Sequence, residues 1–189
     1  MSNDASNVSV GKPLASGAIF VAPSGTTAPT DAKTALAATF KCVGYISEDG
    51  VTNAIKTDTT PTKAWGGVAV NTVQTSREET FKFKMIEINE DSLEQAFGKG
   101  NVTKDSASGA ITIKHNGNER AVYVYVIETV LSAERIKRVV IPNGKVTELG
   151  DIVYNDSDPI GYEVTVAASP DANQNTAYEY IAKTTTAGV

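Results

Sequence analysis

The sequence predicts a mainly β protein, either a sandwich or a barrel, on two observations. Alternating or β-branched runs recur from about residue 64 to the C-terminus, and turn residues separate them. Hydrophobic residues make up 41% and charged residues 21% of the 189 positions, as in an ordinary folded domain. No convergent set of reactive side chains accompanies the strands. We therefore expect a structural protein that is not an enzyme and has no catalytic residues, no cofactor and no metal.

The chain divides into an N-terminal arm, one domain and a short tail. Residues 1–17 are rich in Ser, Asn and Gly without periodicity, which is typical of a flexible arm. The domain is expected over 18–183. Residues 184–189 are mostly Thr, Ala and Gly and are expected to be a flexible tail.

The first part of the domain predicts three elements before residue 52. These are a strand over 18–22, a short helix over 32–38 capped by Thr30 or Asp31, and a strand over 40–46. Asp49-Gly50 predicts a tight turn after the second strand, within Ser47–Gly50. A loop or hairpin is expected through 52–61.

A Trp65-Gly66-Gly67 turn leads into two strand-like runs, 68–74 and 80–88. Within the second run, Phe81, Phe83 and Met85 alternate with Lys82 and Lys84, as in a half-buried antiparallel strand. Water or another chain is expected on the lysine face.

A helix is predicted over about 90–97. Its acidic start follows Asn89, and Gly98 ends it. Leu93 and Phe97 lie four residues apart, so one stripe of the helix can pack on a sheet.

The C-terminal half predicts further strands. Asn116-Gly117 predicts a hairpin turn before a long strand over 121–131, which is apolar on both faces and is therefore expected to be central. More strands are expected over 135–141, 146–148, 151–154, 161–168 and 177–182, with Pro142-Asn143-Gly144 as one of the separating turns.

Charge and targeting signals exclude several classes. A formal net charge of −5 disfavours a stable grip on nucleic acid, which needs many Lys and Arg contacts to phosphates. No apolar window reaches the ~18 residues of a membrane span, and no membrane insertion is expected. The first twenty residues carry only Lys12 and no apolar run, so we expect synthesis in a cytoplasm rather than secretion.

Individual candidate sites favour structural interpretations. His115, the only histidine, is expected to be an exposed turn residue rather than a catalytic one. Asp156-Ser157-Asp158 predicts an acidic turn because it lacks the rest of a calcium loop. The carboxylates over 87–94 favour helix stabilisation over hydrolase chemistry. Trp65 is interpreted as a core or subunit contact, with a sugar platform as the alternative.

Three groups of residues carry a resemblance to a known family. They are Gly44-Tyr45-Ile46-Ser47-Glu48-Asp49-Gly50, then Lys63-Ala64-Trp65-Gly66-Gly67, then 81–90 with Gly98. Further support comes from 138–142, 146–148 and 161–166. In order and spacing, from about residue 10 to 182, the chain resembles the major tail tube proteins of long-tailed (siphovirus-type) bacteriophages.

The resemblance implies a fold of two packed antiparallel sheets flanked by a short helix. It also implies a virion tail subunit that is assembled in the host cytoplasm into stacked hexameric rings. The implied partners are further copies of the chain, a tape measure protein, a tail terminator, distal tail proteins and double-stranded DNA in transient passage without specific binding.

Assembly through strand edges is the leading hypothesis, with strands 68–74 and 80–88 as one hairpin and 121–131 and 135–141 as the other. The N-terminal segment 1–17 and the loop 52–61 are expected to become ordered on assembly. The alternative is a monomeric carbohydrate-binding β-sandwich module that uses Trp65 with Tyr123 or Tyr125. The predicted interface or lumen residues are Trp65, Val70, Thr72, Gln74, Phe81, Lys82, Lys84, Tyr123, Tyr125 and Arg138.

Overall fold

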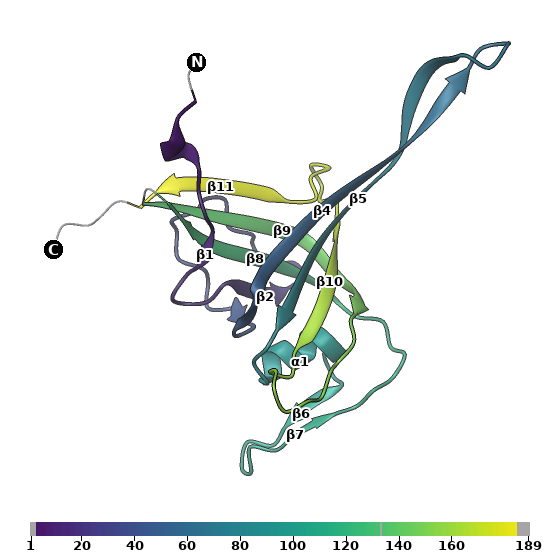
Figure 1. The fold of residues 1–189 in the computed structure, drawn as a ribbon. Coiled ribbons are helices and arrows are strands. Elements are labelled where there is room, and N and C mark those ends of the chain that lie inside the picture. Colours follow the sequence, from purple (N-terminus) through teal and green to yellow (C-terminus); the bar gives the residue numbers. More distant parts are fainter. Residues whose placement is uncertain (1–2, 133, 185–189) are drawn as a thin grey trace.

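The structure, a computed structural model, describes residues 3–132 and 134–184 and consists mainly of antiparallel strands (Figure 1). One large sheet has the order β3-β2-β8-β9-β10-β5-β4, with β1 joined to β8 and β11 joined to β9, and β6 and β7 form a separate hairpin. The elements are η1 (Ala5–Asn7), β1 (Lys12–Pro13), β2 (Ile19–Pro23), β3 (Lys41–Cys42), β4 (Ile46–Lys63), β5 (Ala69–Met85), α1 (Glu90–Phe97), β6 (Val102–Lys104), β7 (Ile111–Ile113), β8 (Val122–Leu131), β9 (Arg135–Leu149), β10 (Tyr162–Ser169) and β11 (Tyr178–Lys183).

The large sheet curls without closing. The first half of β9 pairs with β11 and its second half pairs with β10, so these two strands follow one another along β9. Figure 1 shows β8, β9 and β11 lying along roughly one axis, while β4, β5 and β10 cross that axis steeply. The expected mainly β fold with one flanking helix is confirmed, and the two expected layers are two parts of one curled sheet.

The main core lies inside this curl. Phe81, Phe83 and Met85 on β5 are buried, and the intervening Lys82 and Lys84 are not, as the alternation predicted. Strands β2, β8, β9 and β10 contribute to the same core, for example through Tyr125, which is 1% exposed. Burial of these aliphatic and aromatic side chains is the main stabilising contribution to the fold.

Helix α1 covers one end of the core and has the predicted bounds. Asn89 caps it by accepting a hydrogen bond from the Ser92 amide at 2.8 Å, and Ser92 Oγ accepts one from the Asn89 amide at 3.2 Å. This reciprocal arrangement satisfies backbone donors that a helix start otherwise leaves free. Leu93 and Ala96 are fully buried against the sheet.

Strand β8 is covered on both faces, which confirms its predicted central position. Tyr123, Tyr125 and Ile127 point into the main core, while Val124 and Val126 belong to a second apolar cluster on the opposite face. The segment 24–40 covers this second cluster through Ala28, Leu36 and Phe40.

The helix predicted over 32–38 is absent. Residues 31–34 form bends, and the Asp31 carboxylate accepts hydrogen bonds from the amides of Lys33 and Thr34, each at 2.6 Å. Asp and Asn side chains compete in this way with helical backbone bonding. The strand expected over 40–46 is reduced to Lys41–Cys42.

The largest correction concerns residues 47–88. The expected turn at 47–50 is a bulge within strand β4, where Ile46 pairs with Met85 and Val51 with Phe83. The expected loop over 52–61 is also part of β4. The runs 68–74 and 80–88 are not two strands of a hairpin, because 69–85 is the single strand β5, whose partner is β4.

Three further turn or strand predictions are wrong. Pro142-Asn143-Gly144 lies within β9. Asn116-Gly117 does not close a hairpin, because β7 pairs with β6 through the turn over 105–109. Residues 151–154 are not a strand.

The N-terminal segment contacts the domain. Lys12 and Pro13 pair with Val130 and Thr129 at the end of β8, and Arg135 Nη2 donates a hydrogen bond to Ser9 Oγ at 2.6 Å. Of the tail expected over 184–189, residues 185–189 lie outside the described part of the chain.

Candidate assembly interface

A long two-stranded arm projects from the domain (Figure 1). We define the arm as residues 54–80, the distal parts of β4 and β5. The last pair between β5 and β10 joins Thr80 to Ala167, so no third strand continues along the arm. Residues 52–75 are all exposed.

Both long edges of the arm carry unpaired backbone donors and acceptors among the described strands. A two-stranded hairpin is marginally stable in water, and open edges favour pairing with another strand. The arm therefore has the properties of a strand donor or acceptor for another chain.

The base of the arm is fixed to the loop between β10 and β11 by Glu79, which is 7% exposed. Its carboxylate accepts hydrogen bonds from Asn53 Nδ2 at 3.1 Å, from Arg77 Nη2 at 3.0 Å and from the Thr176 hydroxyl. Burial alone would raise the pKa of Glu79, but these hydrogen bonds outweigh it and lower the pKa below its usual value. The base is thus held in place while the rest of the arm is free.

The tip of the arm presents Trp65 fully to solvent, at 105% relative exposure. Gly66 and Gly67 have φ values of 99° and 88°, a region that favours glycine, and the Ala64 amide donates to the Val68 carbonyl at 2.8 Å. The predicted turn is confirmed, and the core interpretation of Trp65 is wrong. The large exposed apolar side chains of the arm are Ile55, Trp65, Val68, Val70 and Val73.

On the lysine face of β5, Lys82 is paired with a carboxylate that the sequence did not indicate. Lys82 Nζ lies 2.8 Å from Glu163 Oε1 on the neighbouring strand β10, and this contact raises the pKa of Lys82. Lys84 packs over Gly161. Glu79 and Glu128 are paired elsewhere, since Glu79 contacts Arg77 and Glu128 contacts Arg138.

The predicted interface residues fall into three groups. Val70, Thr72 and Gln74 lie on the arm with Trp65, and all four side chains are exposed. The others on β5 are the core residue Phe81, the exposed Lys82 and the half-buried Lys84. The remaining three, Tyr123, Tyr125 and Arg138, are buried within the subunit.

The two tyrosines are unsuited to stacking on a sugar. Tyr125 donates a hydrogen bond to Gln95 Oε1 at 2.6 Å in the core, and burial raises its pKa. Tyr123 is 8% exposed, and its hydroxyl is buried without a hydrogen-bond partner in the described structure. A platform that combines Trp65 with these rings is therefore not present.

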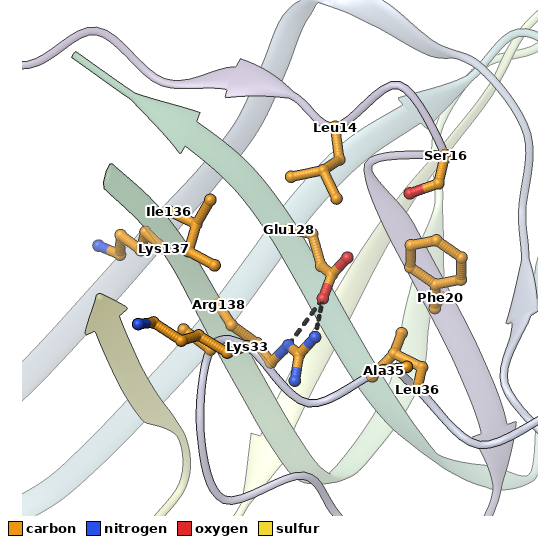
Figure 2. A pocket seen from close by; sticks show the side chains of 11 residues that line it. Leu14, Ser16, Phe20, Lys33, Ala35, Leu36, Glu128, Ile136, Lys137 and Arg138 are labelled. Carbon is orange, nitrogen blue, oxygen red and sulfur yellow. Dashed lines mark hydrogen bonds and ion pairs between the residues drawn. The ribbon is translucent and has the colours of Figure 1, made fainter. Parts of the chain in front are cut away.

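Arg138 forms the floor of a cavity of about 360 Å³ (Figure 2). Its Nε donates to Glu128 Oε1 at 2.7 Å, and its Nη1 donates to the carbonyls of Asp31 and Thr34 at 2.8 and 2.9 Å. One guanidinium thus joins β9 to β8 and to the segment that covers the second apolar cluster. Its role in this chain is to hold the subunit together.

The acidic residues over 87–94 act within the subunit. Glu87 accepts hydrogen bonds from the Tyr45 amide and from Asn89 Nδ2, each at 3.1 Å. Burial and the neighbouring carboxylate of Glu90 raise the pKa of Asp91. Within residues 3–132 and 134–184, His, Cys, Asp and Glu side chains do not gather in threes around a possible metal position, and no helix there has the length and apolarity to cross a membrane.

A second concave surface lies at the other end of β4, and sequence reasoning did not find it. We call it the groove: it has a volume of about 680 Å³ and lies between the segments 11–18 and 42–51, with Glu87, Ile127 and Thr129 also in its wall. Its residues come from four distant parts of the sequence and share no periodicity, so no local pattern indicated it.

The fold and its surfaces define a class of protein. Its described polar clusters fix loops and strands, and its prominent exposed feature is an arm with open strand edges. This is a structural β protein suited to assembly with other chains.

The comparisons with known proteins identify the family. The whole chain, residues 1–189, matches the sequence model of the phage tail tube protein family, and the chain belongs to this family. It is thus a structural subunit of a virion tail.

Solved structures resemble the chain at 10% sequence identity. One is the tube-terminating cap of the anti-feeding prophage, with a TM-score of 0.44 over 96% of this chain and 100% of the other. Another is the tail of an empty gene transfer agent particle refined with C6 symmetry, with a TM-score of 0.41 over 89% and 95%. A third is the virion of a native gene transfer agent particle, with a TM-score of 0.40 over 87% of this chain and 95% of the other. The search of curated protein sequences finds no match.

Proposed function

We propose that this tail tube subunit self-assembles into stacked hexameric rings around a channel for the viral genome. The observation that carries the proposal is the arm, in which 24 consecutive residues, 52–75, are exposed on two strands with open edges. Strand pairing with a neighbour satisfies those edges, and a heterologous contact of this kind closes into a ring when the rotation permits.

The implied role is non-enzymatic. The subunit is assembled in the host cytoplasm, with a tape measure protein occupying the channel and with a terminator and distal tail proteins at its ends. DNA passes without specific binding, which agrees with the net charge of −5 and with the neutralisation of Lys82 by Glu163.

Electron microscopy of the concentrated protein, with and without added tail tips, tests this proposal. We expect hollow rings or tubes with six-fold symmetry in end-on views. Sedimentation in dilute solution gives the mass of the free subunit for comparison. A protein that stays monomeric at all concentrations and in the presence of tail tips contradicts the proposal.

A further inference from the structure

We propose that the tip of the arm of one subunit docks into the groove of a second copy, with Trp65 as its anchor. The inference rests on the proposed function and deepens it, because it assigns the two surfaces that meet. The tip is residues 59–70, and the groove is the concave surface between segments 11–18 and 42–51.

The groove has the size and lining for an aromatic anchor. Leu14, Ile46, Val51 and Ile127 contribute apolar surface, and its volume of about 680 Å³ is that of a typical ligand pocket. A tryptophan buries about 150–250 Å² when it is enclosed, and tryptophan is enriched among the residues that dominate interface energies. Trp65 is fully exposed in the isolated subunit and thus has this entire area to bury.

The charges of the tip and of the groove also favour their contact. Between residues 59 and 76 the arm carries a single charged side chain, Lys63. The groove carries three carboxylates, Glu48, Asp49 and Glu87, and no lysine or arginine. Complementary charge of this kind selects the partner and its orientation.

The other cavity fits the tip less well. Figure 2 shows the lysines Lys33 and Lys137 around the site of the buried Arg138–Glu128 pair. Three cations and one carboxylate line this smaller cavity, so Lys63 meets like charge there.

The contact must join two copies. Strand β4 contributes Ile46–Val51 to the groove and ends with Lys63 at the tip. Twelve residue steps of extended strand separate Val51 from Lys63, which corresponds to about 40 Å. The tip of a subunit therefore cannot reach its own groove, and each copy keeps one free tip and one free groove for the next copy.

The native cysteine provides a direct test. Cys42 is the only cysteine of the chain, lies in the groove wall and is partly exposed. In an Ala64→Cys variant, which retains Trp65, assembled tubes are treated with a bis-maleimide of about 10 Å reach, close to three residues of extended chain. We expect a ladder of covalent dimers, trimers and longer oligomers on a denaturing gel.

Two further variants make the result decisive. Ala64→Cys with Cys42→Ser has a thiol only at the tip, and we expect the ladder to disappear. Adding Ser47→Cys to this background supplies a groove thiol at a different position and restores the ladder. Tubes that form without a ladder in both tip–groove pairs overturn the docking proposal and leave the tube function standing, and so does a dimer formed by the tip-only variant. Failure of every variant and of the unmodified chain to form tubes overturns both.

Charge exchange tests the match independently of cysteine chemistry. We expect Lys63→Glu to raise the protein concentration needed for assembly about tenfold or more, and Glu48→Lys with Asp49→Lys to do the same. Combining all three restores part of the loss. Lys104→Glu on the exposed strand β6 is the matched control for net charge and leaves the threshold unchanged. Absence of rescue in the combined variant overturns the assignment.

Discussion

Arg138 and Glu128 form an ion pair in the interior of the subunit, with residues 4% and 7% exposed. Two donors of the guanidinium meet the same carboxylate oxygen, Glu128 Oε1, and its remaining Nη1 holds two backbone carbonyls of the segment 31–34. Strands β8 and β9 are adjacent, so the pair is a cross-strand contact between Cα partners. It fixes the covering segment to the sheet.

Removing one partner is expected to be more costly than removing both. Arg138→Met leaves a buried carboxylate without its cation, and we expect a loss of about 3–5 kcal/mol in the free energy of unfolding. Arg138→Met with Glu128→Leu removes the uncompensated charge and recovers part of this loss. Urea denaturation of the dilute subunit measures both. Equal losses in the two variants would show that the carbonyl contacts, and not the ion pair, carry the stability.

Glu79 makes the stability depend on pH in acid. Its folded-state pKa is lowered from 4.5, so its contribution is fully present above about pH 4.5 and is lost as the pH falls through the lowered value. We expect the unmodified chain to be more stable than Glu79→Gln at pH 7 and the difference to shrink below pH 4.5. Urea midpoints across this range provide the measurement. A difference that grows on acidification contradicts this assignment.

Gly144 is expected to tolerate no side chain. A Cβ at this position overlaps the ring of Tyr125 and lies 2.9 Å from Cγ1 of Val166, and Tyr125 is itself held by Gln95. Gly144→Ala should reduce the free energy of unfolding by about 1–3 kcal/mol. Gly117→Ala is the control, because nothing lies within 4 Å of a Cβ there. Thermal unfolding compares the two, and equal midpoints would exclude a steric role for Gly144.

Shortening the arm should separate folding from assembly. Replacing residues 58–76 with Asn-Gly joins the paired residues Thr57 and Arg77 through a favoured two-residue turn. Because the deleted residues are almost all exposed, we expect the free energy of unfolding to change by no more than about 0.5 kcal/mol. The same variant should form no tubes in electron micrographs. Tubes of normal appearance would show that the arm is dispensable.

Trp65 is the only tryptophan, so its fluorescence reports on the tip alone. In the dilute subunit the indole is in water, and its emission should be that of a fully exposed tryptophan. On assembly we expect a shift to shorter wavelength and reduced quenching by acrylamide. The Trp65→Phe variant supplies the background. An unchanged spectrum in tubes means that the tip remains in solvent.

The sequence predicted those elements whose side chains have a regular environment. Alternation at Phe81, Phe83 and Met85 identified the buried part of β5, and the cap at Asn89 identified α1. The apolar run of β8 predicted a central strand because both of its faces are covered. In these segments local preference and tertiary burial agree.

The arm was missed because its strands have no buried face. Residues 52–63 of β4 are mostly polar and all exposed, and a strand without a core side shows no hydrophobic period. At Pro142-Asn143-Gly144, turn residues occur in a continuous strand because Gly144 lets β9 pass over Tyr125. The interface predictions at Tyr123, Tyr125 and Arg138 fell on buried side chains, since sequence alone does not distinguish a core face from a contact face.

The slender arm has a mechanical consequence for the tail. From Glu79 outward it consists of two strands, and its pairing shifts register near Asp58 and again near Thr62. A ribbon without a third strand bends more easily than the curled sheet behind it, and each bulge is a local point of bending. A tube whose subunits are linked by such arms is expected to curve by flexing the links while every domain keeps its shape.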